Sequence, residues 1–87
     1  MEKNNINNVE ILNEFVEALK FVRTKRPYTY ERFVGGSYSL VVEYSSMLGR
    51  FIFTGYHNHS IDHKVNCLNC TSIYCEVHKY IENRYLV

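Results

Sequence analysis

The segment CLNCTSIYCEVH, residues 67–78, holds the side chains with the clearest potential for chemistry. It supplies three thiols and one imidazole, from Cys67, Cys70, Cys75 and His78. Two cysteines separated by two residues can wrap a tight turn around one metal ion, with each sulfur about 2.3 Å from it. Cys75 and His78 are three residues apart, so they would share one face of a helix. The sequence therefore predicts a tetrahedral metal site with these four ligands.

Zinc is the metal that this ligand set favours. Soft thiolates with one imidazole select zinc over magnesium or calcium, but this ligand type also suits iron and copper(I). Four protein ligands leave no position for water or substrate, so we expect a structural metal and a binding domain, not an enzyme. Three thiolates against one Zn²⁺ give the centre a formal charge of −1, so the metal itself would repel phosphate.

The same cysteines admit other interpretations. A redox pair of Cys67 and Cys70 would favour a helix that begins at the first cysteine inside a βαβ unit. Buried free cysteines are a second alternative. A cysteine–histidine nucleophile is a third, but the sequence shows no orienting third group and no oxyanion pocket.

Three histidines, His57, His59 and His63, precede the cysteines in a polar stretch. His59 or His63 could replace one of the four ligands, or the two together could hold a second metal. Exposed loop histidines are the simpler interpretation.

Length and composition limit the class of protein. Eighty-seven residues with 46% apolar side chains predict one globular domain, residues 1–87, with residues 1–8 as a flexible N-terminus. An odd number of cysteines, no export signal and no long apolar stretch predict an intracellular chain without a membrane partner. The formal net charge of +1 means that binding to nucleic acid would depend on a local patch.

The hydrophobic patterns predict an α+β fold. Residues 9–25 carry apolar side chains at steps of three and four, which predicts a helix that Pro27 stops. Phe21 lies off the apolar stripe of this helix and is expected to be a half-covered surface residue. Residues 28–34, 37–44 and 50–56 predict a three-stranded antiparallel meander, with the helix covering one face.

The rest of the chain is assigned from its turns and polar stretches. Gly35 and Gly36 suit a tight turn, and residues 45–49 suit a longer hairpin loop. Residues 57–66 read as a loop. The cysteine knuckle would lead into a short C-terminal helix from Ile73, capped by Thr71 or Ser72.

A hairpin followed by a cysteine pair, and then by a Cys/His pair entering a helix, resembles the SWIM-type zinc finger over about residues 37–85. Two residues, in place of the family's one, separate the ligands of each pair here. The resemblance implies an accessory role in binding DNA or protein, with Cys67, Cys70, Cys75 and His78 as ligands by position.

Basic and aromatic residues cluster between Lys20 and Arg32, where cations could contact phosphates and aromatic rings could stack on exposed bases. The leading prediction is nucleic-acid binding, with DNA as the expected target. The predicted contacts, which include two lysines near the knuckle, are Arg23, Lys25, Arg26, Tyr28, Tyr30, Arg32, Lys64 and Lys79. The alternative is a protein-interaction module, an adaptor or inhibitor, that docks through a tyrosine-rich surface including Tyr38, Tyr44 and Tyr56.

Overall fold

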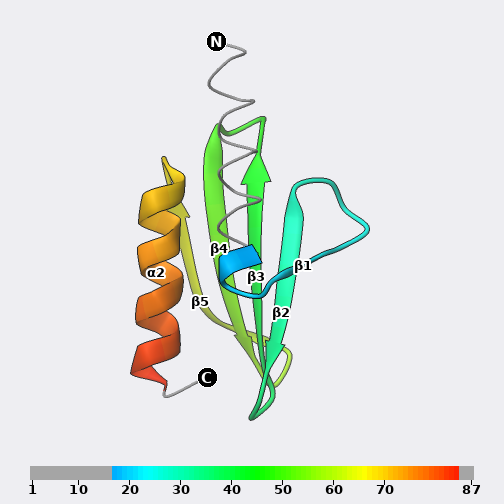
Figure 1. The fold of residues 1–87 in the computed structure, drawn as a ribbon, viewed down its shortest axis with the longest axis vertical. Coiled ribbons are helices and arrows are strands. Elements are labelled where there is room, and N and C mark those ends of the chain that lie inside the picture. The colour runs from blue at the N-terminus through cyan, green and yellow to red at the C-terminus, as the bar shows by residue number, and fades with distance from the viewer. Residues whose placement is uncertain (1–16, 85–87) are drawn as a thin grey trace.

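The computed structural model describes residues 17–84, which form an antiparallel sheet with a helix on one side (Figure 1). The elements are β1 (Val22–Arg23), β2 (Thr29–Val34), β3 (Tyr38–Ser45), β4 (Arg50–His57), β5 (Ser60–Cys67) and α2 (Cys70–Asn83). The five strands lie in the order β1-β2-β3-β4-β5, so each strand pairs with the next along the chain. Helix α2 packs against β4 and β5. No helix among the described residues is long and apolar enough to cross a membrane.

The prediction of an N-terminal helix packed on the meander is wrong. Its last part, Val22–Arg23, is strand β1, paired antiparallel with β2. Lys20 has a φ of 64°, outside the helical region, and the turn before it closes with a hydrogen bond from the Lys20 amide to the Glu17 carbonyl. Phe21 is 6% exposed, so its predicted place on the surface is also wrong. Residues 1–16, which include the predicted flexible N-terminus, lie outside the described residues.

The prediction of a loop over residues 57–66 is wrong as well, because Ser60–Cys67 form β5 along the edge of the sheet. The two residues of the β4–β5 turn, Asn58 and His59, have φ angles of 53° and 68°. Positive φ at both positions is the geometry of a type I′ hairpin turn, whose twist matches that of the strands it joins. The turn residues are an asparagine and a histidine instead of the common Asn-Gly, so the signal is weak in the sequence.

The three predicted strands are confirmed as β2, β3 and β4, with ends shifted by about one residue. The turn between β2 and β3 spans three residues, 35–37, with positive φ at Gly36 and Ser37. The β3–β4 loop closes with a hydrogen bond of 2.8 Å from the Gly49 amide to the Ser45 carbonyl. Alternation in β3 places Leu40 and Val42 in the core, as the period of two predicts.

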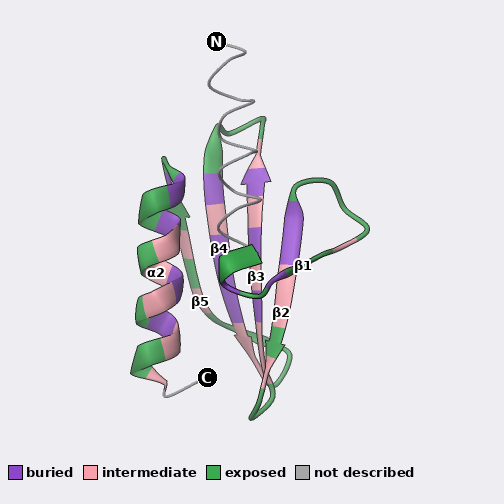
Figure 2. Ribbon diagram, viewed as in Figure 1, coloured by how far each residue is buried: buried purple, intermediate pink, exposed green. Residues whose placement is uncertain are grey.

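Buried residues lie along β2, β3 and β4 and on the side of α2 that meets the sheet (Figure 2). By the strand register, the buried apolar side chains of these strands share one face, which carries the core. Leu40, Phe51 and Phe53 are completely buried on this face, and α2 covers it with Ile73 and Val77. The side chain of Asn69 caps the helix by accepting a hydrogen bond of 2.9 Å from the Ser72 amide. The prediction of Thr71 or Ser72 as the cap is therefore wrong, and the helix begins at Cys70 instead of Ile73.

A polar contact ties the end of α2 to β5. Asp62 is an extra residue in β5, since Gly55 pairs with His63 and the next residue, Tyr56, pairs with Ile61. The Tyr80 hydroxyl donates a hydrogen bond of 2.9 Å to the Asp62 carboxylate, and Arg84 Nε donates one of 2.7 Å to the same oxygen. These hydrogen bonds hold the pKa of Asp62 below its ordinary value, although burial opposes the shift.

Candidate functional site

The loop from Thr24 to Tyr28 joins β1 to β2 and is held in one shape by its own hydrogen bonds. The Thr24 amide donates to the Thr29 carbonyl at 3.0 Å, and the Thr24 hydroxyl accepts from the Arg26 amide at 3.1 Å. Tyr28 has a φ of 54°, and its carbonyl accepts a hydrogen bond of 3.0 Å from the Tyr44 amide of β3. Hydrogen bonds within the loop and to β3 therefore restrain its backbone.

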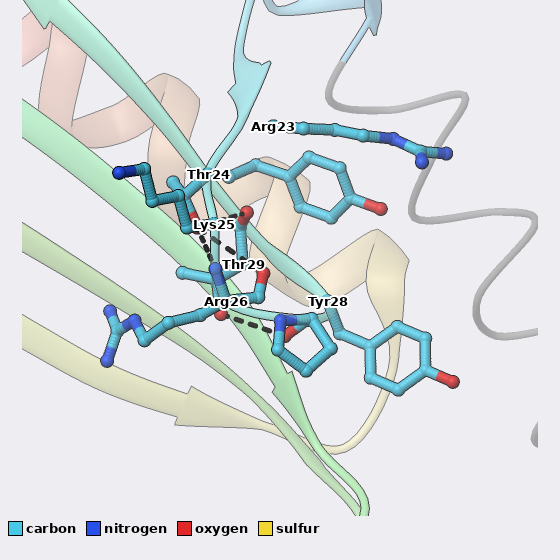
Figure 3. Close-up of a pocket in the computed structure, with 8 residues that line it drawn as sticks. Arg23, Thr24, Lys25, Arg26, Tyr28 and Thr29 are labelled. Carbon is cyan, nitrogen blue, oxygen red and sulfur yellow. Dashed lines mark hydrogen bonds between the residues drawn. The ribbon is translucent and has the colours of Figure 1, made fainter.

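Residues 23–30 line a hollow of about 360 Å³ beside this loop (Figure 3). Arg23, Lys25 and Arg26 are exposed, and none of them forms an ion pair with another residue of the described range 17–84. The Tyr28 side chain is 45% exposed. Figure 3 shows Lys25 and Arg26 extending to one side of the loop, and Arg23 and Tyr28 to the other. We name this set, Arg23 together with the loop Thr24–Tyr28, the basic loop.

The other predicted nucleic-acid contacts are not part of this exposed group. Tyr30 is 4% exposed and packs in the core, so its ring is closed to a base. Arg32 donates a hydrogen bond of 3.1 Å from Nη1 to the Leu19 carbonyl, which anchors the chain that enters β1. Lys64 is exposed on β5, at the other end of the strand order, and Lys79 is exposed on α2 with Nζ 4.0 Å from a Glu76 carboxylate oxygen. The structure thus gathers Arg23, Lys25, Arg26 and Tyr28 and leaves Lys64 and Lys79 apart from them.

The four predicted zinc ligands fall into two pairs. Cys67 ends β5 and Cys70 begins α2, and both are buried, whereas Cys75 is exposed. Five residues along a helix turn it by about 140°, so Cys70 and Cys75 leave α2 on different sides. His78 shares the side of Cys75, and its ring centroid lies 4.6 Å from that of Tyr74.

This arrangement does not form a tetrahedron from the four side chains. Within residues 17–84, no group of three or more histidine, cysteine, aspartate or glutamate residues is placed to hold a metal ion. Binding of zinc by Cys67, Cys70, Cys75 and His78 together would require the first turn of α2 to rearrange. The zinc site stays a prediction, which a measurement of bound metal decides.

The two buried thiols are poor nucleophiles in this environment. Burial raises the pKa of Cys67, and the negative charge of Glu76 raises it further. Burial raises the pKa of Cys70 to about 12. Both are therefore protonated near neutral pH, while thiol–disulfide exchange needs a thiolate. The redox alternative stays a prediction, which detection of a reversible Cys67–Cys70 disulfide would test.

The histidines upstream are placed along the β4–β5 hairpin. His57 stacks on Tyr38, with ring centroids 4.1 Å apart, and His59 lies in the turn. His59 and Cys67 are eight residues apart along an extended strand, or about 26 Å, which is too far for a shared metal. His63 lies nearer, with Nε2 3.9 Å from a Glu76 carboxylate oxygen.

The expected tyrosine-rich surface is smaller than the tyrosine content of the chain suggests, because Tyr30, Tyr44 and Tyr80 are buried.

The sequence analysis did not identify Thr24 as the residue that shapes the basic loop. Threonine side chains commonly bond to backbone groups two residues on, but this signal is weak without a known turn.

Comparison with known proteins found no matching family model, no matching characterised protein and no matching solved structure. The resemblance to the SWIM-type zinc finger therefore stays a prediction.

Proposed function

We propose that this chain binds nucleic acid through the basic loop. Arg23, Lys25 and Arg26 contact backbone phosphates, and the exposed ring of Tyr28 stacks on a base. The observation that carries the proposal is the grouping of three exposed cations and one exposed aromatic ring around a single hollow in one loop. Because hydrogen bonds already restrain the basic loop, less conformational entropy is lost when it binds a flexible strand.

A single-stranded segment is the expected ligand, and DNA its expected type. Stacking on Tyr28 needs a base that is free of a duplex, and such stacking stabilises binding by about 1–3 kcal/mol per base. Cations on both sides of the loop suit a strand that crosses over its tip, with phosphates before and after the stacked base. Competition between DNA and RNA of one sequence measures the preference.

The salt dependence of binding tests the location of the site. A labelled single-stranded oligonucleotide, too short to reach two protein molecules, is titrated by fluorescence anisotropy at several salt concentrations. We compare Lys25→Ala/Arg26→Ala with Lys64→Ala/Lys79→Ala, since both double variants remove two positive charges. Each phosphate contact contributes about 0.7 to the slope of log K against log salt for single strands, so the first variant should lower the slope by about 1.4.

The matched variant should keep the affinity and slope of the unmodified chain, because Lys64 and Lys79 lie away from the basic loop. Equal losses in the two variants would show that only total charge matters. That result, or a lack of binding to any oligonucleotide at low salt, would overturn the proposal.

A further inference from the structure

The face of the sheet opposite the core has no role in the proposed binding by the basic loop. Side chains alternate between the two faces of a strand, and paired residues of neighbouring strands share a face. The register places these residues opposite the core, on what we name the open face: Val22, Thr29, Glu31, Phe33, Ser39, Val41, Glu43, Ser45, Arg50, Ile52, Thr54, Tyr56, Ile61, Lys64 and Asn66. Among the described elements, α2 packs on the other face, which carries Phe51 and Phe53.

One row of the open face has an exposed apolar side chain at each of its two ends. The register runs from Phe33 on β2 through Ser39 and Tyr56 to Ile61 on β5. Phe33 is 74% exposed and Ile61 is 59% exposed. With the partly exposed ring of Tyr56 between them, these two side chains supply the apolar part of a candidate interaction surface.

Charge divides the same face into two halves. A second row runs from Glu31 on β2 through Val41 and Thr54 to Lys64 on β5. Glu43 adds a negative charge on β3, and Arg50 adds a positive charge on β4. The half formed by β2 and β3 is therefore acidic, and the half formed by β4 and β5 is basic.

A second copy of the chain complements this pattern. Rotation by 180° about an axis that lies between two open faces, parallel to the strands and midway between β3 and β4, places β5 of each copy over β2 of the other. Glu31 then faces Lys64 of the second copy, and Phe33 faces its Ile61. Tyr56 faces the small side chain of Ser39, so large and small residues interlock. Each contact occurs twice, as a two-fold axis requires.

The other in-plane axis, perpendicular to the strands, would place β2 over β2. Glu31 and Glu43 of the two copies would then gather on one side of the interface, and like charges repel. Electrostatics therefore selects the axis parallel to the strands.

We propose that this chain forms a two-fold symmetric homodimer by packing two open faces together, with Glu31 of each copy paired to Lys64 of the other. Aligned sheets pack about 10 Å apart with a small rotation between their strands, which preserves these contacts. Strands of this length and number give a footprint of about 500 Å² for each copy, before side-chain relief is counted. Specific interfaces bury about 600–1,000 Å² for each partner, so the dimer should dissociate on dilution.

Sedimentation velocity over a concentration series tests the dimer. The unmodified chain should shift from monomer to dimer as its concentration rises. Phe33→Asp places a charge at the β2 end of the row that links Phe33 to Ile61, where Phe33 faces Ile61 of the second copy, and should leave a monomer at every concentration. Because Phe33 is exposed, this variant should retain the circular dichroism spectrum and urea midpoint of the unmodified chain. A chain that stays monomeric at its highest soluble concentration, or a dimer that survives Phe33→Asp, overturns the proposal.

Charge reversal tests the axis. Glu31→Lys alone and Lys64→Glu alone each create like-charged pairs and should raise the dimer dissociation constant about tenfold or more. A mixture of these two variants restores two opposite-charge pairs and should form a heterodimer about as tight as the original dimer. Single variants that dimerise like the unmodified chain, or a mixture that stays monomeric, contradict the pairing of Glu31 with Lys64.

Discussion

Gly55 of β4 lies directly against the Tyr80 ring of α2. A Cβ atom added to Gly55 would lie 2.5 Å from the ring of Tyr80, whose side chain is 2% exposed. The Tyr80 ring is also fixed by its hydrogen bond to Asp62 and by the Arg84 guanidinium, which lies 3.8 Å from the ring centroid. The ring cannot move without breaking these contacts, so the position requires a residue without a side chain.

Gly55→Ala should therefore destabilise the fold by about 1–3 kcal/mol, the usual range for overpacking a core. Gly35→Ala is the matched control, because no atom lies within 4 Å of the point that a Cβ there would occupy and its φ is not positive. Urea unfolding followed by circular dichroism gives both values. Equal midpoints for the two variants would show that Tyr80 is not held against Gly55.

At the scale of elements, the β5–α2 junction decides the chemistry of the cysteines. The sequence places four suitable ligands within twelve residues, and their spacing is compatible with one metal ion. In the folded helix Cys70 is buried and Cys75 is exposed. Binding of one metal ion by all four ligands therefore competes with the folded first turn of α2.

Native mass spectrometry with and without a chelator tests the zinc prediction. If zinc binds through all four ligands, the chain carries one added zinc mass, and the chelator removes the metal together with the folded structure. Cys75→Ser should then abolish the added mass. If Cys75 has no role in binding a metal, its replacement should change stability by less than about 0.5 kcal/mol, as for other exposed positions. An unmodified chain without the added mass, and with folding insensitive to the chelator, contradicts the prediction.

At the scale of the whole molecule, the basic loop and the open face would act together. An axis parallel to the strands leaves both basic loops at the same end of the dimer, one at each edge. A single strand long enough to reach both loops should bind with an avidity that a short strand cannot gain.

Phe33→Asp separates the two contributions to binding. The variant should bind a short oligonucleotide as the unmodified chain does, because Phe33 lies outside the basic loop. On a long oligonucleotide, at concentrations where the unmodified chain is dimeric, the variant should lose the additional affinity. Anisotropy titrations with both lengths measure the difference. Equal affinity of the two proteins for the long strand would show that the loops bind independently.

Local patterns in the sequence determined much of this protein. The alternation of β3 and the apolar repeat of Ile73 and Val77 each depend on neighbouring residues, so they were predicted correctly. The turn at Gly35 and Gly36 was predicted in place, but it also includes Ser37. The concentration of cations between Arg23 and Arg26 was visible for the same reason. The hairpin turn at Asn58 and His59 was missed, because its residues carry only a weak local signal.

Tertiary structure decided the rest, because pairing with a neighbouring strand can outweigh local propensity. Val22–Arg23 continue a helical pattern in the sequence, yet they form β1 because the edge of β2 offers them hydrogen bonds. Polar β5 is a strand because β4 supplies a full-length partner. Whether a side chain is buried depends on the packing of several elements, so the sequence did not predict it residue by residue. Tyr30 is buried whereas Tyr28 is exposed, and Cys70 is buried whereas Cys75 is exposed.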